Sequence, residues 1–179
     1  MKNQALIIWC TGMSGSGKTT LTKETENLLT TEGYKVFVID GDIKRSNDRI
    51  KLSFRRSDII KNNLSIADQC LKIRFQYDII YVSVISPYNK SREMIRNKLS
   101  PNFKLVFMDA KIESLIERDV KGLYKKAKEG QISDLIGYSK NSPYEKPLNP
   151  DLIIDTNKQG LLANNIKILY KFTKSSINI

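Results

Sequence analysis

The sequence predicts an α/β fold, with a five-stranded parallel sheet covered by helices on both faces. Five short apolar runs alternate along the 179 residues with segments that have helical periodicity. Apolar runs without polar alternation are typical of parallel strands that are buried on both faces. A glycine-rich loop connects the first run to the first helix. We therefore expect a single domain over residues 1–179.

The expected strands span residues 5–11, 35–39, 78–85, 104–109 and 151–156. The expected helices span residues 21–29, 57 or 58 to about 76, 90–99, 112–118 and 161–172. The segment from residue 57 or 58 to about 76 has its apolar residues near helical spacing, as in Ile59, Leu64, Ala67 and Leu71. Ligands of parallel sheets bind at the carboxyl ends of the strands, so functional residues are expected there.

The loop after the first strand matches the phosphate-binding pattern G-x-x-x-x-G-K-[ST] at every fixed position. Backbone N–H groups of such a loop surround a polyphosphate, and the following helix adds its positive dipole end. Lys18 is expected at the β- and γ-phosphates, and the Thr19 hydroxyl is expected on Mg²⁺. The predicted ATP-phosphate residues are Gly12, Ser14, Gly15, Ser16, Gly17, Lys18, Thr19 and Thr20.

Two carboxylates follow the second strand, in Asp40-Gly41-Asp42. Phosphate-loop ATPases and GTPases usually have an aspartate at the end of a central strand, but the third strand here ends in Ser86-Pro87. This arrangement favours a small-molecule kinase, in which an aspartate accepts the proton of a substrate hydroxyl. The chain has no histidine, so proton transfer must depend on Asp, Glu, Lys or Tyr.

Residues 119–147 form a long polar segment inside an otherwise compact chain. Segments of this length are commonly active-site lids. Its lysines, Lys121, Lys125, Lys126 and Lys128, are candidates to close over the phosphates and exclude water. The alternative is a solvated charged helix.

The formal net charge of +11 suits either anionic small substrates or nucleic acid. The cationic residues are spread along the chain and no nucleic-acid-binding motif accompanies them, so a nucleotide-dependent nucleic-acid-binding protein is a remote alternative. The two cysteines lack metal-ligand spacing. No apolar run approaches the length of a membrane span, and no signal peptide precedes the first strand, so we expect a cytoplasmic protein.

Taken together, the motifs resemble the adenylylsulfate (APS) kinase family, a group of P-loop kinases. The matching pieces are residues 12–20, Asp40-Gly41-Asp42 with Arg45, residues 85–88, residues 118–127 (RDVKGLYKKA) and residues 143–147 (PYEKP). Enzymes of this family transfer the γ-phosphate of ATP to the 3′-hydroxyl of a nucleotide whose 5′ end carries an activated acid. The resemblance implies ATP and Mg²⁺ as cofactors and a nucleotide as acceptor. It also suggests a homodimer.

The resemblance implies a role for each matching residue. Asp42 would lie at the acceptor's 3′-hydroxyl with Asp40 in support, and Lys121 would bridge donor and acceptor. Arg118 and Thr156 are implied on the ATP side. The implied acceptor-binding residues are Asp42, Arg45, Phe54, Asn62, Ile85, Ser86, Lys121 and Leu135. Ser86 matches a serine that is sometimes described as a phosphoserine intermediate, but direct in-line transfer suffices, and we expect it to hydrogen-bond the substrate.

Several acceptor-side positions depart from the family pattern. An arginine of the family is Ile59 here, an arginine pair is Leu64-Ser65, and a phenylalanine of the 119–147 segment is Leu135. Loss of an anion-binding arginine from a desolvated site is costly if the acceptor is unchanged. The pattern therefore favours a diverged member such as cytidine diphosphoramidate kinase, which acts in capsular polysaccharide decoration. A genuine adenylylsulfate kinase is the alternative.

Overall fold

The computed structural model describes residues 4–42, 55–158 and 160–177. Its centre is a five-stranded sheet in the order β2-β3-β1-β4-β5, and every neighbouring pair is parallel. The strands are β1 (Leu6–Thr11), β2 (Val36–Asp40), β3 (Ile79–Ser83), β4 (Phe103–Asp109) and β5 (Leu152–Asp155). The predicted α/β fold is confirmed, and all five strands were placed to within a few residues.

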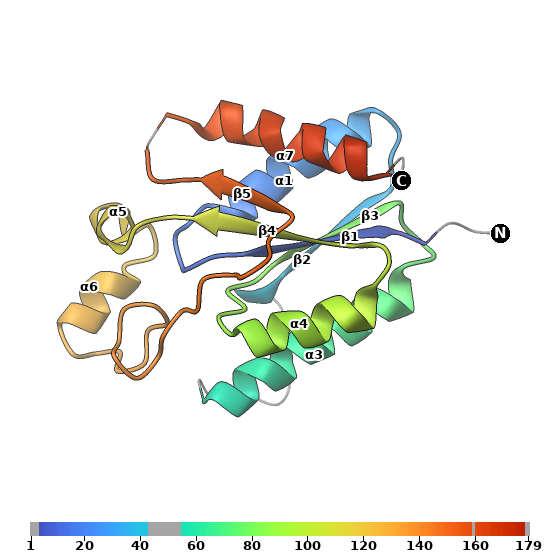
Figure 1. Cartoon of the computed structure of the whole chain (residues 1–179). Helices are drawn as coiled ribbons and strands as arrows, with labels where there is room; N and C mark the ends of the chain where they lie inside the picture. The colour runs from blue at the N-terminus through green and yellow to red at the C-terminus, as the bar shows by residue number, and fades with distance from the viewer. Residues whose placement is uncertain (1–3, 43–54, 159, 178–179) are drawn as a thin grey trace.

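Helices cover both faces of the sheet, as Figure 1 shows. One face carries α1 (Lys18–Thr31) and α7 (Leu162–Ile177), and the other carries α3 (Arg56–Ile73) and α4 (Asn89–Leu99). Two shorter helices, α5 (Ile112–Arg118) and α6 (Leu123–Lys128), lie beyond the carboxyl ends of the strands. No helix in the described ranges is both long enough and apolar enough to cross a membrane.

The central strand β1 shows why the sheet forms two cores. Ile7 and Trp9 pack into the core under α3 and α4, whereas Ile8 and Cys10 pack into the core under α1 and α7. All four side chains are buried, because successive residues of a strand point to opposite faces and both faces are covered by helices. The two cores fix the carboxyl edge of the sheet, where the predicted site residues lie.

The structure differs from the sequence prediction in two places that bear on the site. The third strand ends at Ser83 rather than at residue 85, because the chain leaves the sheet there and turns at Ser86, which has a φ of 43°. The long 119–147 segment contains the short helix α6, which the sequence prediction gave only as an alternative. Both segments lie at the carboxyl edge of the sheet.

Candidate active site

The phosphate loop connects β1 to α1 and has the backbone geometry of an anion-binding loop. Gly15 and Gly17 have φ values of 78° and 86°, a region in which residues with a Cβ are strained. Gly12 is required for another reason, since a Cβ there would lie 2.8 Å from the Met108 carbonyl oxygen. These glycines let the loop turn closely at the N-terminus of α1, where N–H groups are available to phosphate oxygens.

Lys18 is buried beneath this loop. Its ammonium group donates to the carbonyl oxygens of Gly12 (2.8 Å) and Met13 (2.9 Å) and to the Ser16 hydroxyl (3.3 Å). Burial lowers the pKa of Lys18 to about 8, and the nearby Asp42 carboxylate opposes that shift. A cation held in a desolvated position interacts strongly with a phosphate that arrives beside it.

A chain of polar contacts joins the phosphate loop to the end of β2 and on to the 119–147 segment. The Thr19 hydroxyl donates to Asp40 Oδ2 at 2.6 Å, and the backbone N–H of Asp42 donates to Asp40 Oδ1 at 2.8 Å. The ammonium of Lys121 contacts the carboxylate of Asp42. The structure therefore brings together the predicted residues Thr19, Asp40, Asp42 and Lys121.

These residues fit ATP and Mg²⁺ by their chemistry. The Thr19 hydroxyl and the Asp40 carboxylate are hard oxygen donors, which suit Mg²⁺. The described residues contain no group of three or more His, Cys, Asp or Glu side chains that would hold a metal alone. This suits Mg²⁺, which usually keeps several waters and binds through one or two protein ligands together with substrate phosphates.

Next to this contact chain lies a pocket of about 730 Å³, which we call the acceptor pocket. It is lined by Asp42 from the end of β2, by α3, by the chain after β3 and by the 119–147 segment. Aliphatic side chains form much of its wall, among them Ile59, Ile132 and Leu135. The predicted residues that it brings together are Ser14, Asp42, Asn62, Ile85, Ser86, Lys121 and Leu135.

The 119–147 segment packs directly on the phosphate loop. The buried hydroxyl of Tyr124 donates to the Ser14 carbonyl oxygen at 2.8 Å. A Cβ at Gly137 would lie 2.3 Å from Met13 Sδ, so the backbone approaches the loop as closely as a glycine permits. Of the four predicted lysines, only Lys121 reaches a site residue; Lys125, Lys126 and Lys128 are exposed. That Lys125, Lys126 and Lys128 close over bound phosphates stays a prediction.

The remaining predicted residues lie outside the acceptor pocket or outside the described residues. Arg118 ends α5, where its Nε donates to the Ser114 carbonyl oxygen at 3.0 Å and its Nη2 is buried without a hydrogen-bond partner. The hydroxyl of Thr156, after β5, donates to the Asp109 carbonyl oxygen at 3.2 Å. Thr20 is exposed on α1. Arg45 and Phe54 lie outside the described residues.

Three polar residues that support the pocket were missed by sequence reasoning, and two of them, Asn63 and Arg92, are buried. Asn63 Nδ2 donates to the Ser86 hydroxyl at 3.1 Å. The guanidinium of Arg92 is buried and donates to the carbonyl oxygen of Ser86, which holds the turn that follows β3. The Tyr144 hydroxyl is 2.9 Å from Thr11 Oγ1, at the end of β1. Of these, only Tyr144 lay in a motif that the sequence singled out.

Comparisons with known proteins agree with this geometry. The family model described as adenylylsulphate kinase matches residues 4–155. An adenylyl-sulfate kinase of Rippkaea orientalis is 41% identical over 171 residues, covering 96% of this chain and 93% of the relative. One of Microcystis aeruginosa is 38% identical over 174 residues, covering 97% and 94%.

A solved structure shows the same fold over almost the whole chain. The APS kinase of Mycobacterium tuberculosis, in complex with AMPPNP and APS, superposes with a TM-score of 0.87 at 28% identity and covers 96% of this chain and 98% of its own. A shikimate kinase of Bacteroides thetaiotaomicron, at 14% identity and a TM-score of 0.57, shares the fold alone. The chain therefore belongs to the adenylylsulfate kinase family, whose members are phosphotransferases that act on a hydroxyl acceptor with ATP and Mg²⁺ as cofactors.

Proposed function

We propose that this protein transfers the γ-phosphate of ATP to the 3′-hydroxyl of adenylyl sulfate. The observation that carries the proposal is the contact chain from Thr19 through Asp40 and Asp42 to Lys121, which lies between the phosphate loop and the acceptor pocket. The relatives named above support adenylyl sulfate as the acceptor better than cytidine diphosphoramidate, which the sequence had favoured.

The mechanism assigns Asp42 to the acceptor hydroxyl. Its carboxylate lines the acceptor pocket and is placed to receive the hydroxyl proton as the oxygen attacks the γ-phosphorus. The Lys121 ammonium is thereby released from its contact with Asp42, and it then neutralises negative charge on the transferring phosphoryl group. Lys18 holds positive charge at the phosphates, and Mg²⁺ on Thr19 supplies further charge neutralisation when it is bound. Direct transfer needs no covalent intermediate on Ser86.

The 119–147 segment acts as the lid in this proposal. It supplies one wall of the acceptor pocket and rests on the phosphate loop through Tyr124 and Gly137. Closure of this kind excludes water, which would otherwise hydrolyse ATP without acceptor. We also assign Arg118 and Thr156 to the ATP side. The Nη2 of Arg118 is buried there without a hydrogen-bond partner.

Cytidine diphosphoramidate is a second candidate acceptor, and one observation favours it. Ile59 and Leu135 both line the acceptor pocket, at positions where the family pattern has an arginine and a phenylalanine. A pyrimidine needs less stacking surface than adenine, so an aliphatic wall suits it.

A coupled ADP-release assay with each acceptor, ATP and Mg²⁺ tests the proposal. We expect acceptor-dependent ADP release with adenylyl sulfate, and ³¹P NMR should show a 3′-phosphate ester. Turnover of cytidine diphosphoramidate alone would select the second candidate. If neither acceptor stimulates ADP release and the protein shifts nucleic acid in a salt-sensitive way, the nucleic-acid-binding alternative is supported instead. Sedimentation velocity on the same sample tests the predicted homodimer.

A further inference from the structure

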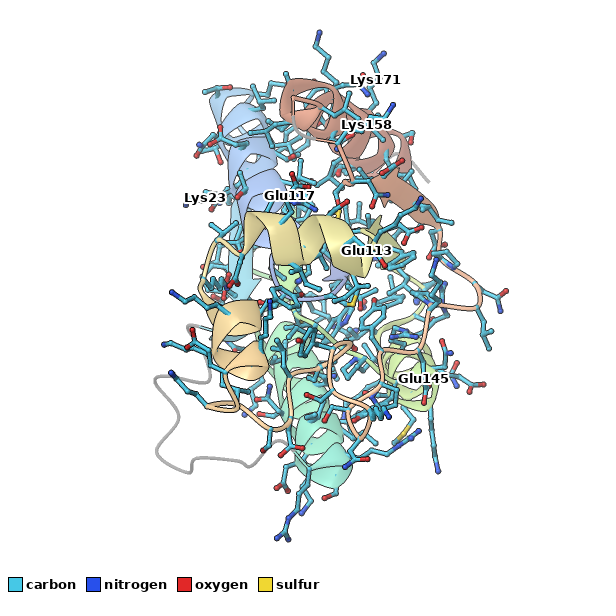
Figure 2. All side chains as sticks on the ribbon, turned by 90° about the vertical axis from the view of Figure 1, so that its left-hand side faces the viewer. Lys23, Glu113, Glu117, Glu145, Lys158 and Lys171 are labelled. Carbon is cyan, nitrogen blue, oxygen red and sulfur yellow. The ribbon has the colours of Figure 1, made fainter. Side chains whose placement is uncertain are left out.

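Ser86 has a strained backbone at the wall of the acceptor pocket. Its φ of 43° lies in the left-handed region, which is unfavourable for a residue with a Cβ. Thr11 Oγ1 donates to its carbonyl oxygen at 3.3 Å, and the buried guanidinium of Arg92 donates to the same oxygen. Arg92 also donates to the carbonyl oxygen of Glu145, a residue that Figure 2 labels in a view onto this end of the sheet. A strained residue persists where its neighbours fix it, and such residues cluster at functional sites.

The side chain of Ser86 is held as well. Asn63 Nδ2, from α3, donates to Ser86 Oγ at 3.1 Å. Both residues line the acceptor pocket, although Asn63 is only 3% exposed and Ser86 only 1%. A serine hydroxyl has two lone pairs and one proton to donate. Because Asn63 occupies a lone pair, the proton needs an acceptor of its own, and no residue in the described part of the chain accepts it.

The wall next to this hydroxyl is apolar. Ile59 precedes Asn63 by four residues, which places both on one face of α3, and Ile85 is the neighbour of Ser86 in the chain. Both isoleucines line the acceptor pocket. Aliphatic side chains cannot accept a hydrogen bond, and a buried O–H without an acceptor is unfavourable. A ligand in the pocket therefore completes the hydrogen bonding of Ser86, in surroundings of low polarity that strengthen the bond.

We propose that Asn63 is a positioning residue, which orients the Ser86 hydroxyl so that it donates to the nucleotide in the acceptor pocket. The group that receives this hydrogen bond is an oxygen or a ring nitrogen with a free lone pair. It belongs either to the distal acid group of the nucleotide or to its nucleoside monophosphate part. Asn63 thus acts on nucleotide affinity through Ser86. This inference rests on the proposed function, since it takes the pocket as the acceptor site.

A double-mutant cycle of nucleotide binding tests the proposal without any turnover. Isothermal titrations of the whole chain use adenylyl sulfate, or cytidine diphosphoramidate if only that binds, with saturating AMPPNP and Mg²⁺. Ser86→Ala should weaken binding about tenfold through the loss of one hydrogen bond, and Asn63→Leu about three- to tenfold. The double variant should bind no more weakly than Ser86→Ala, because Asn63 then has no hydroxyl to orient. An independent structural role of Asn63 would instead multiply the two losses, to roughly 30-fold or more.

Two further variants control for packing and folding. Asn97→Leu makes the same replacement at an exposed position on α4 and should stay within about twofold of wild type. Asn63→Asp keeps the shape of the side chain, but its carboxylate only accepts hydrogen bonds and takes the Ser86 proton for itself. It should bind the nucleotide at least as weakly as Ser86→Ala, with unchanged AMPPNP affinity. In kinetics, Asn63→Leu should raise KM for the nucleotide and leave KM for ATP unchanged.

The matching nucleoside 5′-monophosphate separates the two sources of the hydrogen bond. If Ser86→Ala weakens binding of the monophosphate as much as that of the full nucleotide, the bonded atom lies in the part that the two ligands share. If the monophosphate binds equally to wild type and Ser86→Ala, the bonded atom lies in the distal acid group.

Multiplied losses in the double variant, or wild-type affinity in Asn63→Asp, overturn the positioning role of Asn63. Absence of turnover with either acceptor overturns the proposed function instead, and the titrations still decide on Asn63. A wild-type chain that binds neither acceptor overturns both.

Discussion

The donor and acceptor sides of this site are built in different ways. On the donor side, the eight consecutive residues Gly12–Thr19 provide the loop, the buried lysine and the hydroxyl for Mg²⁺. On the acceptor side, the pocket is lined by residues from five separate segments of the chain. A ligand held by the backbone of one loop can be recognised from local sequence, whereas a ligand held by scattered side chains is defined only by the tertiary structure.

The largest effect is expected where the two sides meet, at Asp42. Asp42→Asn should lower kcat by roughly 10²–10⁴-fold because it removes the proton acceptor, while AMPPNP affinity stays within about threefold. Asp68→Asn is a matched control, since that exposed carboxylate pairs with Lys98 away from the site. A kcat for Asp42→Asn that stays close to the wild-type value would disprove the assignment of Asp42 as the base.

The next effect tests whether the 119–147 segment belongs to the catalytic machinery. Lys121→Met should lower kcat by roughly 10²-fold, because one preorganised cation is lost from the transferring phosphoryl group. Lys125→Met removes an exposed lysine from the same segment and should leave steady-state rates nearly unchanged. Equal losses in the two variants would show that the general positive charge of the segment matters, and that the Lys121–Asp42 contact has no special part.

The donor side should also show a pH dependence of its own. Burial lowers the pKa of Lys18 to about 8, so in the free protein its ammonium loses a proton as the pH rises through 8. Bound phosphates favour the charged form and raise that pKa. AMPPNP affinity should therefore be constant below pH 8 and fall by up to about tenfold per pH unit above it. Titrations with AMPPNP at several pH values check this. The Lys18→Met variant should bind AMPPNP weakly, with an affinity that does not change with pH.

The smallest effect comes from two glycines of the 119–147 segment. Gly137→Ala must strain a φ of 81° and displace Met13, whereas Gly130→Ala strains a φ of 75° with nothing within 4 Å of the new Cβ. Backbone strain alone costs about 1–2 kcal/mol, so both should lower the free energy of unfolding. Only Gly137→Ala should also raise KM for the acceptor several-fold. Equal KM values in the two variants would show that close packing on the phosphate loop is not needed.

The same contrast explains what the sequence could predict. The phosphate loop and the Asp40/Asp42 pair follow from a local motif and from strand ends that meet at one edge of a parallel sheet. Lys121 was one of four candidate lysines of the 119–147 segment, and the resemblance singled it out. Arg92 and Asn63 were missed because a helix pattern does not say which buried polar side chain turns toward Ser86. Val84 and Ile85 read as strand because they are apolar, but they line the acceptor pocket after β3 has ended.

The most direct test of direct transfer is a single-turnover quench with γ-³²P-labelled ATP and saturating adenylyl sulfate. The account predicts that the label passes from ATP to the 3′-oxygen of the acceptor without ever residing on the protein, and that Asp42→Asn greatly slows this transfer. Label on Ser86 before product forms, or undiminished transfer by Asp42→Asn, would contradict it.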